Sequence, residues 1–286
     1  MGIVDERTAL KHLLELHLTN HVAFRLAGAF VNTAYAVAGP MGVGKSTYAY
    51  YTAKAGYLKY LCYSHQLTKT DECAEHVLRK YDICIGGDCE EPDEIDEKLL
   101  KDSIFVGDED IARLNDEIEA IALGKRERFK MLYLDDILVM GLYHMGGVYK
   151  QLYLWFTRNT QFIRTISKVL LLTTQSVDLI PRPLRKALMI IKAGANYTAT
   201  NFTFNSVKVA RLWYKGKLIP YRYYDTVWRD ELPRSKLFKM PVWLEEKIEE
   251  RKKKTILIYA QMLKEAIKRE KERGTSPFAF LGDDEN

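Results

Sequence analysis

The 286-residue chain lacks any uninterrupted apolar stretch of the ~18 residues that a membrane span requires. Its first residues, MGIVDERTALKHLL, carry charges where a secretory signal would be apolar. It also has only four cysteines, which in a chain of this size do not suggest a disulfide framework. These absences lead us to expect a cytoplasmic protein with no disulfide framework and no membrane partner.

The paired C-x-x-C spacing typical of zinc sites is missing as well. A metal site would have to use Cys73, His76, Cys84 and Cys89, of which the first two are spaced to share one face of a helix. Buried free cysteines are the simpler interpretation, because cysteine is among the most frequently buried residue types.

What the chain does contain fits a folded protein. Hydrophobic residues make up 47% of it and aromatic residues 12%, in a length that suits one large domain or a domain with an appendage. The net charge of +5 is unevenly spread: residues 71–119 hold 18 Asp and Glu against 5 Lys and Arg, a net of −13, so the remainder carries +18. A basic body suggests an anionic partner, with solvated helix faces as the alternative.

The most informative motif is G-x-x-x-x-G-K-S, formed by Gly39, Gly44, Lys45 and Ser46. It follows an apolar run, residues 35–38, and precedes an expected helix, which is the context of a phosphate-binding loop. Glycines let backbone N–H groups approach phosphate oxygens, the lysine reaches the β- and γ-phosphates of ATP, and the serine hydroxyl is a ligand for Mg²⁺. The expected nucleotide-binding residues are Gly39, Pro40, Met41, Gly42, Val43, Gly44, Lys45, Ser46 and Thr47.

Two further apolar runs end in polar residues. FKMLYLDD ends in Asp135, a candidate for the Mg²⁺ shell, and Asp136, a candidate base that orients the attacking water. KVLLLTTQS ends in Thr174 and Gln175, which we expect at the γ-phosphate because ligands bind at the carboxyl ends of parallel strands; a solvent-exposed strand end is the alternative. Arg182 and Arg185 follow this strand, and either could reach a nucleotide in a neighbouring subunit; Arg185 is the preferred candidate.

The pattern predicts α/β architecture: a three-layer P-loop NTPase with a central, mainly parallel sheet and a C-terminal helical appendage. We expect an N-terminal helical segment (1–34), a core (35–230) with an acidic insertion at about 65–130, a basic helical region (231–274) and a disordered tail (275–286). The expected helices are 5–30, 45–54, 71–80, 95–100, 109–123, 148–166 and one or two within 242–273; the expected strands are 35–38, 57–64, 131–134, 168–176 and two or three between 187 and 229.

Basic and aromatic residues alternate between Lys208 and Arg229, as in RLWYKGK and YRYYDTVW. This alternation fits the binding of a nucleic-acid backbone with stacked bases, and it fits packing within a sheet equally well. The cluster at 251–254 in the last helix fits a DNA-contacting element, a partner helix or a solvated tail.

GPMGVGKS, YLDD and LLLTTQS, in that order and within residues 36–186, resemble the motifs of the additional-strand P-loop ATPases, the division with AAA+, DnaA-like, RecA-like and FtsK/HerA proteins. The chain also looks like the small ATPases of viruses and plasmids of hyperthermophilic archaea. The resemblance implies that Lys45 binds phosphate, Ser46 and Asp135 hold Mg²⁺, Asp136 is the catalytic carboxylate, and Thr174 or Gln175 is the sensor.

The resemblance and the charge together predict an ATPase that acts on DNA in loading, remodelling or replication initiation, as a homo-oligomer that forms a ring with ATP. The acidic insertion is a candidate surface for a protein partner. The alternatives are a DNA-translocating or genome-packaging motor, a nucleotide or small-molecule kinase, and a nucleotide-gated binding protein with scarcely any turnover.

Overall fold

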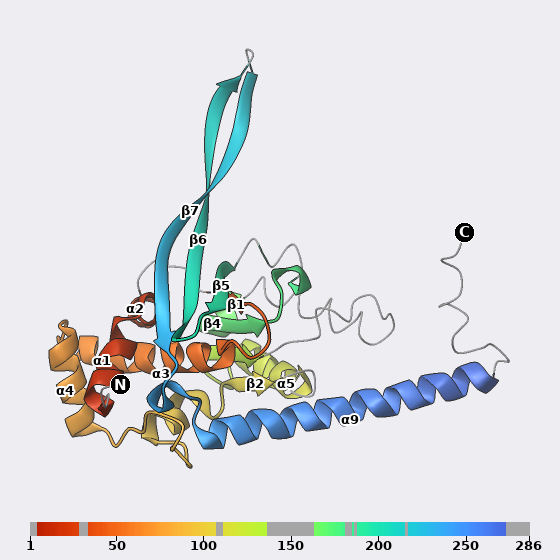
Figure 1. Ribbon diagram of the computed structural model, residues 1–286. Coiled ribbons are helices and arrows are strands. Elements are labelled where there is room, and N and C mark those ends of the chain that lie inside the picture. The colour runs from red at the N-terminus through yellow and green to blue at the C-terminus, as the bar shows by residue number, and fades with distance from the viewer. Residues whose placement is uncertain are drawn as a thin grey trace.

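The computed structural model describes residues 5–28, 34–106, 111–135, 163–180, 185, 188–214 and 217–272, to which all structural statements refer. It is an α/β protein with a seven-stranded, mostly parallel sheet flanked by helices (Figure 1). The strand order is β2-β3-β4-β1-β5-β6-β7, in which neighbours from β2 to β5 run parallel and β5, β6 and β7 run antiparallel.

The strands are β1 (Ala34–Ala38), β2 (Ile104–Val106), β3 (Phe129–Asp135), β4 (Ser167–Thr174), β5 (Met189–Ala195), β6 (Ala199–Tyr214) and β7 (Lys217–Pro233). All of β1 and the centre of β4, residues 169–172, are apolar without interruption because both faces of the sheet are covered. Successive residues of β1 enter two separate core clusters: Tyr35 and Val37 belong to one, Ala34 and Ala36 to the other.

Helices on the two faces supply the rest of these clusters. The first face is covered by α1 (Glu6–Glu15), α2 (His17–Leu26), α3 (Lys45–Ser64) and α4 (Thr70–Lys80), and the second by α5 (Ile111–Ala122) and α7 (Ile163–Ile166). A π-helical turn spans Asp96–Leu100, and α9 (Val242–Glu272) is one helix that extends well past the sheet (Figure 1). The expected three layers, helix on sheet on helix, are present in this arrangement.

The N-terminal helix begins as predicted but is broken. Asp5 caps α1 by accepting a hydrogen bond from the Thr8 N–H at 2.7 Å. The chain then turns at Leu16, and α2 starts against the buried carboxylate of Asp230 in β7, which accepts from the His17 and Leu18 N–H groups at 2.7 and 3.0 Å. The cap comes from over 200 residues away, so no local signal could have placed this break.

The strand predicted at 57–64 is wrong: those residues continue α3, and Gly56 does not end the helix. Most of α3 is buried, so its apolar residues show no helical period and imitate a strand. Gly56 instead allows close packing against α2, since a Cβ built there would lie 2.7 Å from the Val22 Cβ. The neighbours of β1 are β4 and β5.

The expectation of no disulfide framework is also wrong. Disulfides join Cys62 to Cys73, between α3 and α4, and Cys84 to Cys89 within one loop. Each pair is brought to a Cα separation below 6 Å by the fold rather than by a recognisable spacing. Among the described residues no group of three His, Cys, Asp or Glu could hold a metal ion, and no helix there is long and apolar enough to cross a membrane.

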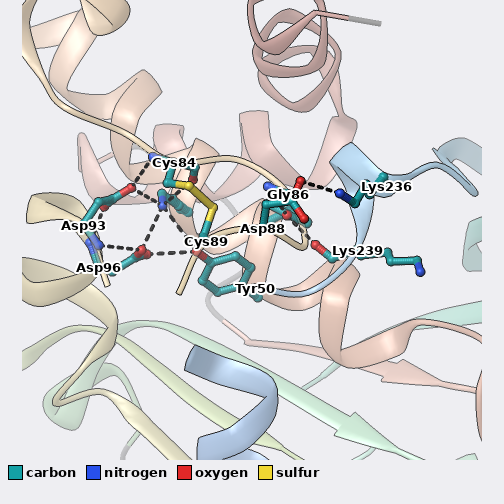
Figure 2. The surroundings of a disulfide bond; sticks show 11 residues. Tyr50, Cys84, Gly86, Asp88, Cys89, Asp93, Asp96, Lys236 and Lys239 are labelled. Atoms are coloured by element: carbon teal, nitrogen blue, oxygen red, sulfur yellow. Dashed lines mark hydrogen bonds and ion pairs between the residues drawn. A yellow bond between two sulfur atoms is a disulfide. The ribbon is translucent and has the colours of Figure 1, made fainter. Parts of the chain in front are cut away.

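A buried ionic cluster lies beside the Cys84–Cys89 loop (Figure 2). The Lys54 ammonium forms ion pairs with Asp93 and Asp96, 2.9 Å from the latter, and all three side chains are almost fully buried. Tyr50 donates a hydrogen bond to Asp96 at 3.1 Å. Burial raises the pKa of the Asp96 carboxyl to about 6, against the opposing effect of Lys54.

The other predicted elements agree more closely. Helices expected at 71–80, 95–100 and 109–123 correspond to α4, the π-turn and α5, and the three strands after residue 187 are present. Strand β2 was not predicted. Of the helix expected at 148–166, only its last turn, α7, falls within the described residues; the tail expected to be disordered, 275–286, lies wholly outside them.

Replacing Gly56 by alanine should destabilise the protein, although alanine is the better helix former by about 1 kcal/mol. The added methyl overlaps Val22, and overpacking costs about 1–3 kcal/mol. Urea unfolding should show a net loss that Val22→Ala in the double variant partly restores. A Gly56→Ala variant as stable as the wild type would refute this contact.

Asp96→Asn should change how stability depends on pH. Because the pKa of Asp96 is raised in the fold, its contribution to the unfolding free energy is complete below 3.8 and is lost as pH rises through about 6. Asparagine does not titrate and so loses no stability in this range. Between pH 4 and 6.5 the unfolding free energy of the variant should therefore rise, relative to that of the wild type, by on the order of 2–3 kcal/mol. Urea unfolding at both pH values measures this; exposed Asp82→Asn is the control and should keep a constant offset.

Candidate nucleotide-binding site

The glycine-rich loop connects β1 to α3. Gly42 and Gly44 have φ values of +73° and +79°, the left-handed region in which glycine is favoured, and α3 begins directly after Gly44. Gly39 passes so close to β5 that an added Cβ would lie 2.6 Å from the Ala193 carbonyl oxygen. The backbone therefore takes the path that a phosphate-binding loop requires.

Lys45 and Ser46 open α3 and face different partners. The Lys45 ammonium donates to the Pro40 carbonyl oxygen at 2.7 Å, so the lysine side chain folds back over the loop. The Ser46 hydroxyl donates to Oδ1 of Asp135 at 2.6 Å. This bond joins the loop to the end of β3, 89 residues further along the chain.

Asp135 is fully buried and is bonded unevenly. Its Oδ1 accepts from three hydroxyls: Ser46 at 2.6 Å, Tyr133 at 2.7 Å and Thr173 at 2.7 Å. Its Oδ2 is buried and has no hydrogen-bond partner among the described residues. Such an oxygen is costly without a partner, so the arrangement leaves one carboxylate oxygen for a ligand.

This oxygen and the Ser46 hydroxyl fit a hard divalent cation. Mg²⁺ prefers oxygen ligands and is usually held by one or two protein oxygens while keeping several waters. The orphaned Oδ2 would supply one such position and the serine hydroxyl another. Ser46 and Asp135 are thus the residues that would hold Mg²⁺, and that role stays a prediction.

A cavity of about 290 Å³ opens at the loop. Its lining comes from the loop and α3 (Met41, Gly42, Gly44, Lys45, Ser46, Thr47), from β4 and its end (Thr173, Gln175), and from α9 (Lys252). Backbone amides, two lysines and hydroxyl groups make this a polar, cationic cavity suited to phosphates.

Residues at the end of β4 point alternately toward the cavity and away from it. Gln175 lies in the cavity as expected, but Thr174 does not line it: its hydroxyl donates to the Ser176 carbonyl oxygen at 3.2 Å. Thr173 lines the cavity in its place, because alternate residues of a strand point the same way. Asp136 lies outside the described residues.

Arg185 is engaged within its own loop. Its guanidinium donates to the carbonyl oxygens of Ile180 at 2.6 Å and Asp178 at 2.8 Å, and it pairs with the Asp178 carboxylate at 3.3 Å. It does not line the phosphate-loop cavity of its own chain. Its expected reach to a neighbouring subunit stays a prediction.

Three residues of the site, Tyr133, Thr173 and Lys252, are not among the predicted site residues, although the first two lie within YLDD and LLLTTQS. Tyr133 lies two positions before Asp135 on the same face of β3, and Thr173 has the same relation to Gln175, so strand alternation alone points to both. Lys252 reaches the cavity because Trp243, Leu244 and Ile248 pack the start of α9 into the core. No sequence pattern announces that placement.

No protein-family model matches the chain, and a search of curated proteins finds no similar sequence. Conclusions about function therefore depend on the chemistry of this site.

Proposed function

We propose that the protein is a P-loop NTPase that binds and hydrolyses ATP with Mg²⁺ and acts on DNA. The observation that carries the proposal is the contact between Ser46 and Asp135, 2.6 Å, at a cavity formed by a glycine-rich loop. Two motifs that are far apart in sequence meet with the oxygen donors that Mg·ATP requires.

The cationic cavity favours a polyphosphate. Amides at the start of α3 carry the partial positive charge of the helix N-terminus. Lys45 adds a mobile charge that exchanges its contact with Pro40 for phosphate oxygens, and Lys252 adds a second. Bound at Ser46 and Asp135, Mg²⁺ would neutralise charge on the phosphates.

The polar residue that follows β4 favours hydrolysis by water over transfer of the phosphate to another acceptor. The Gln175 amide both donates and accepts hydrogen bonds, so it is able to orient a water at the terminal phosphate. Asp136, next to Asp135, keeps its proposed role as the base. A kinase would need an acceptor site in addition, which makes transfer the second candidate.

The sheet order supports the resemblance to the additional-strand ATPases. β4 lies between β1, which carries the phosphate loop, and β3, which carries the acid. One strand therefore separates the two motif strands, as the name of that division implies. Within the division, Gln175 in the cavity favours a translocating motor of FtsK/HerA type as the alternative to a DnaA-like protein.

DNA is proposed as the partner on the basis of charge and shape. Outside the acidic segment the chain is strongly basic. β6 and β7 extend together beyond the other strands as a two-stranded arm, and the sequence of that arm alternates basic and aromatic residues (Figure 1). We propose that the arm contacts the nucleic-acid backbone and that the protein acts as a homo-oligomer.

Lys45→Ala should abolish DNA-stimulated ATP hydrolysis, because it removes the cation at the terminal phosphates. Phosphate release with and without duplex DNA should fall by about a hundredfold or more. Lys69→Ala, which removes an exposed lysine, is the control and should retain the wild-type rate. Unchanged hydrolysis in Lys45→Ala, or label transferred from ATP to an acceptor other than water, would contradict the proposal.

A further inference from the structure

A second cavity, of about 460 Å³, adjoins the first at the phosphate loop. Gly42, Gly44 and Thr47 line both. The rest of its wall comes mainly from the end of β7 and from residues 234–240, which we call the strap, between β7 and α9. Val43, Thr200 and Glu245 complete it. Apart from the phosphate loop, no motif in the sequence marks this cavity.

Its walls differ in chemistry from those of the first. Leu232 and Phe238 are buried core residues that present an apolar surface, to which Val43 and Met240 add. Polar and charged side chains stand among them: Thr47, Thr200, Arg234, Ser235, Lys239 and Glu245. Apolar walls with polar groups placed among them are the usual form of a small-molecule site.

Ser235 provides an independent sign of a missing partner. Its Oγ is buried and makes no hydrogen bond with any described residue. A buried hydroxyl without a partner is destabilising, and this one belongs to a residue that lines the cavity. A ligand able to exchange a hydrogen bond there would remove the penalty.

The strap is held in place before any ligand arrives. The Gly87 N–H donates to the Lys236 carbonyl oxygen at 3.1 Å, and the Lys236 ammonium pairs with the Asp88 carboxylate at 2.7 Å (Figure 2). The Cys84–Cys89 loop is thus bonded to the strap at two points. The Tyr51 hydroxyl, from α3, donates to the Lys239 carbonyl oxygen at 2.6 Å. A prearranged wall loses little entropy on binding.

We propose that this second cavity binds the base and ribose of the nucleoside triphosphate whose phosphates occupy the loop, which rests on the proposed function. A nucleoside has the required chemistry: a flat ring with apolar faces, polar edges and hydroxyl groups. Thr47, shared by the two cavities, marks where phosphates give way to the nucleoside. The strap is thus the part of the chain that lets the site bind a nucleotide more tightly than a bare polyphosphate.

The test compares ATP with inorganic tripolyphosphate, both with Mg²⁺, by isothermal titration calorimetry. Ser235→Leu fills the cavity and should weaken ATP binding about tenfold or more, while tripolyphosphate affinity changes less than about twofold. Ser235→Ala removes one hydrogen bond and should weaken ATP about fivefold without lowering stability. Ser64→Leu, the same change at an exposed site on α3, should alter neither.

A second measurement does not depend on a variant. Hydrogen exchange of the strap amides should slow when ATP binds and stay unchanged with tripolyphosphate. Equal protection by both, or equal loss of both ligands in Ser235→Leu, would overturn the nucleoside site while leaving the proposed function intact. A wild-type protein that binds neither ligand would overturn the proposed function itself.

Discussion

The buried carboxylate of Asp135 is the constraint on which the site depends. Three hydroxyls from three segments converge on one of its oxygens. Each contact fixes a different piece of chain: the start of α3, the body of β3 and the end of β4. Because a charged group this deep is tolerated only when it is well hydrogen-bonded, the three segments must keep their relative positions for the fold to persist.

The helix that begins at the phosphate loop transmits this geometry to the rest of the molecule. Within its first turns α3 contacts β7 through Tyr48, which donates to Asp230 at 2.6 Å, and the strap through Tyr51. Further on, Lys54 holds the acidic segment through Asp93 and Asp96. The helix that would bind phosphate therefore contacts one face of the sheet, the acidic segment and the strap, and it fixes their positions relative to the loop.

The sequence predicted the parts of this structure that are local. Glycine spacing placed the loop, and apolar runs ending in acids or hydroxyls placed β3 and β4, because a strand buried on both faces leaves a continuous apolar signature. The predicted helix ends about ten residues before the end of α3. Burial on all sides removes the helical periodicity of its apolar residues, and Gly56 resembles the residue that ends a helix. Contacts between distant residues, such as the Asp230 cap, the disulfides and Lys252 at the cavity, leave no local trace and could not be predicted.

The central claim is that Ser46 and Asp135 form a magnesium site for a bound nucleotide. It is tested most directly by titrating ATP into the wild type and Asp135→Asn, with and without Mg²⁺, since asparagine keeps an acceptor for the three hydroxyls but loses the charge. The account predicts that Mg²⁺ strengthens ATP binding to the wild type and has little effect on the variant. An equal gain from Mg²⁺ in both proteins would contradict it.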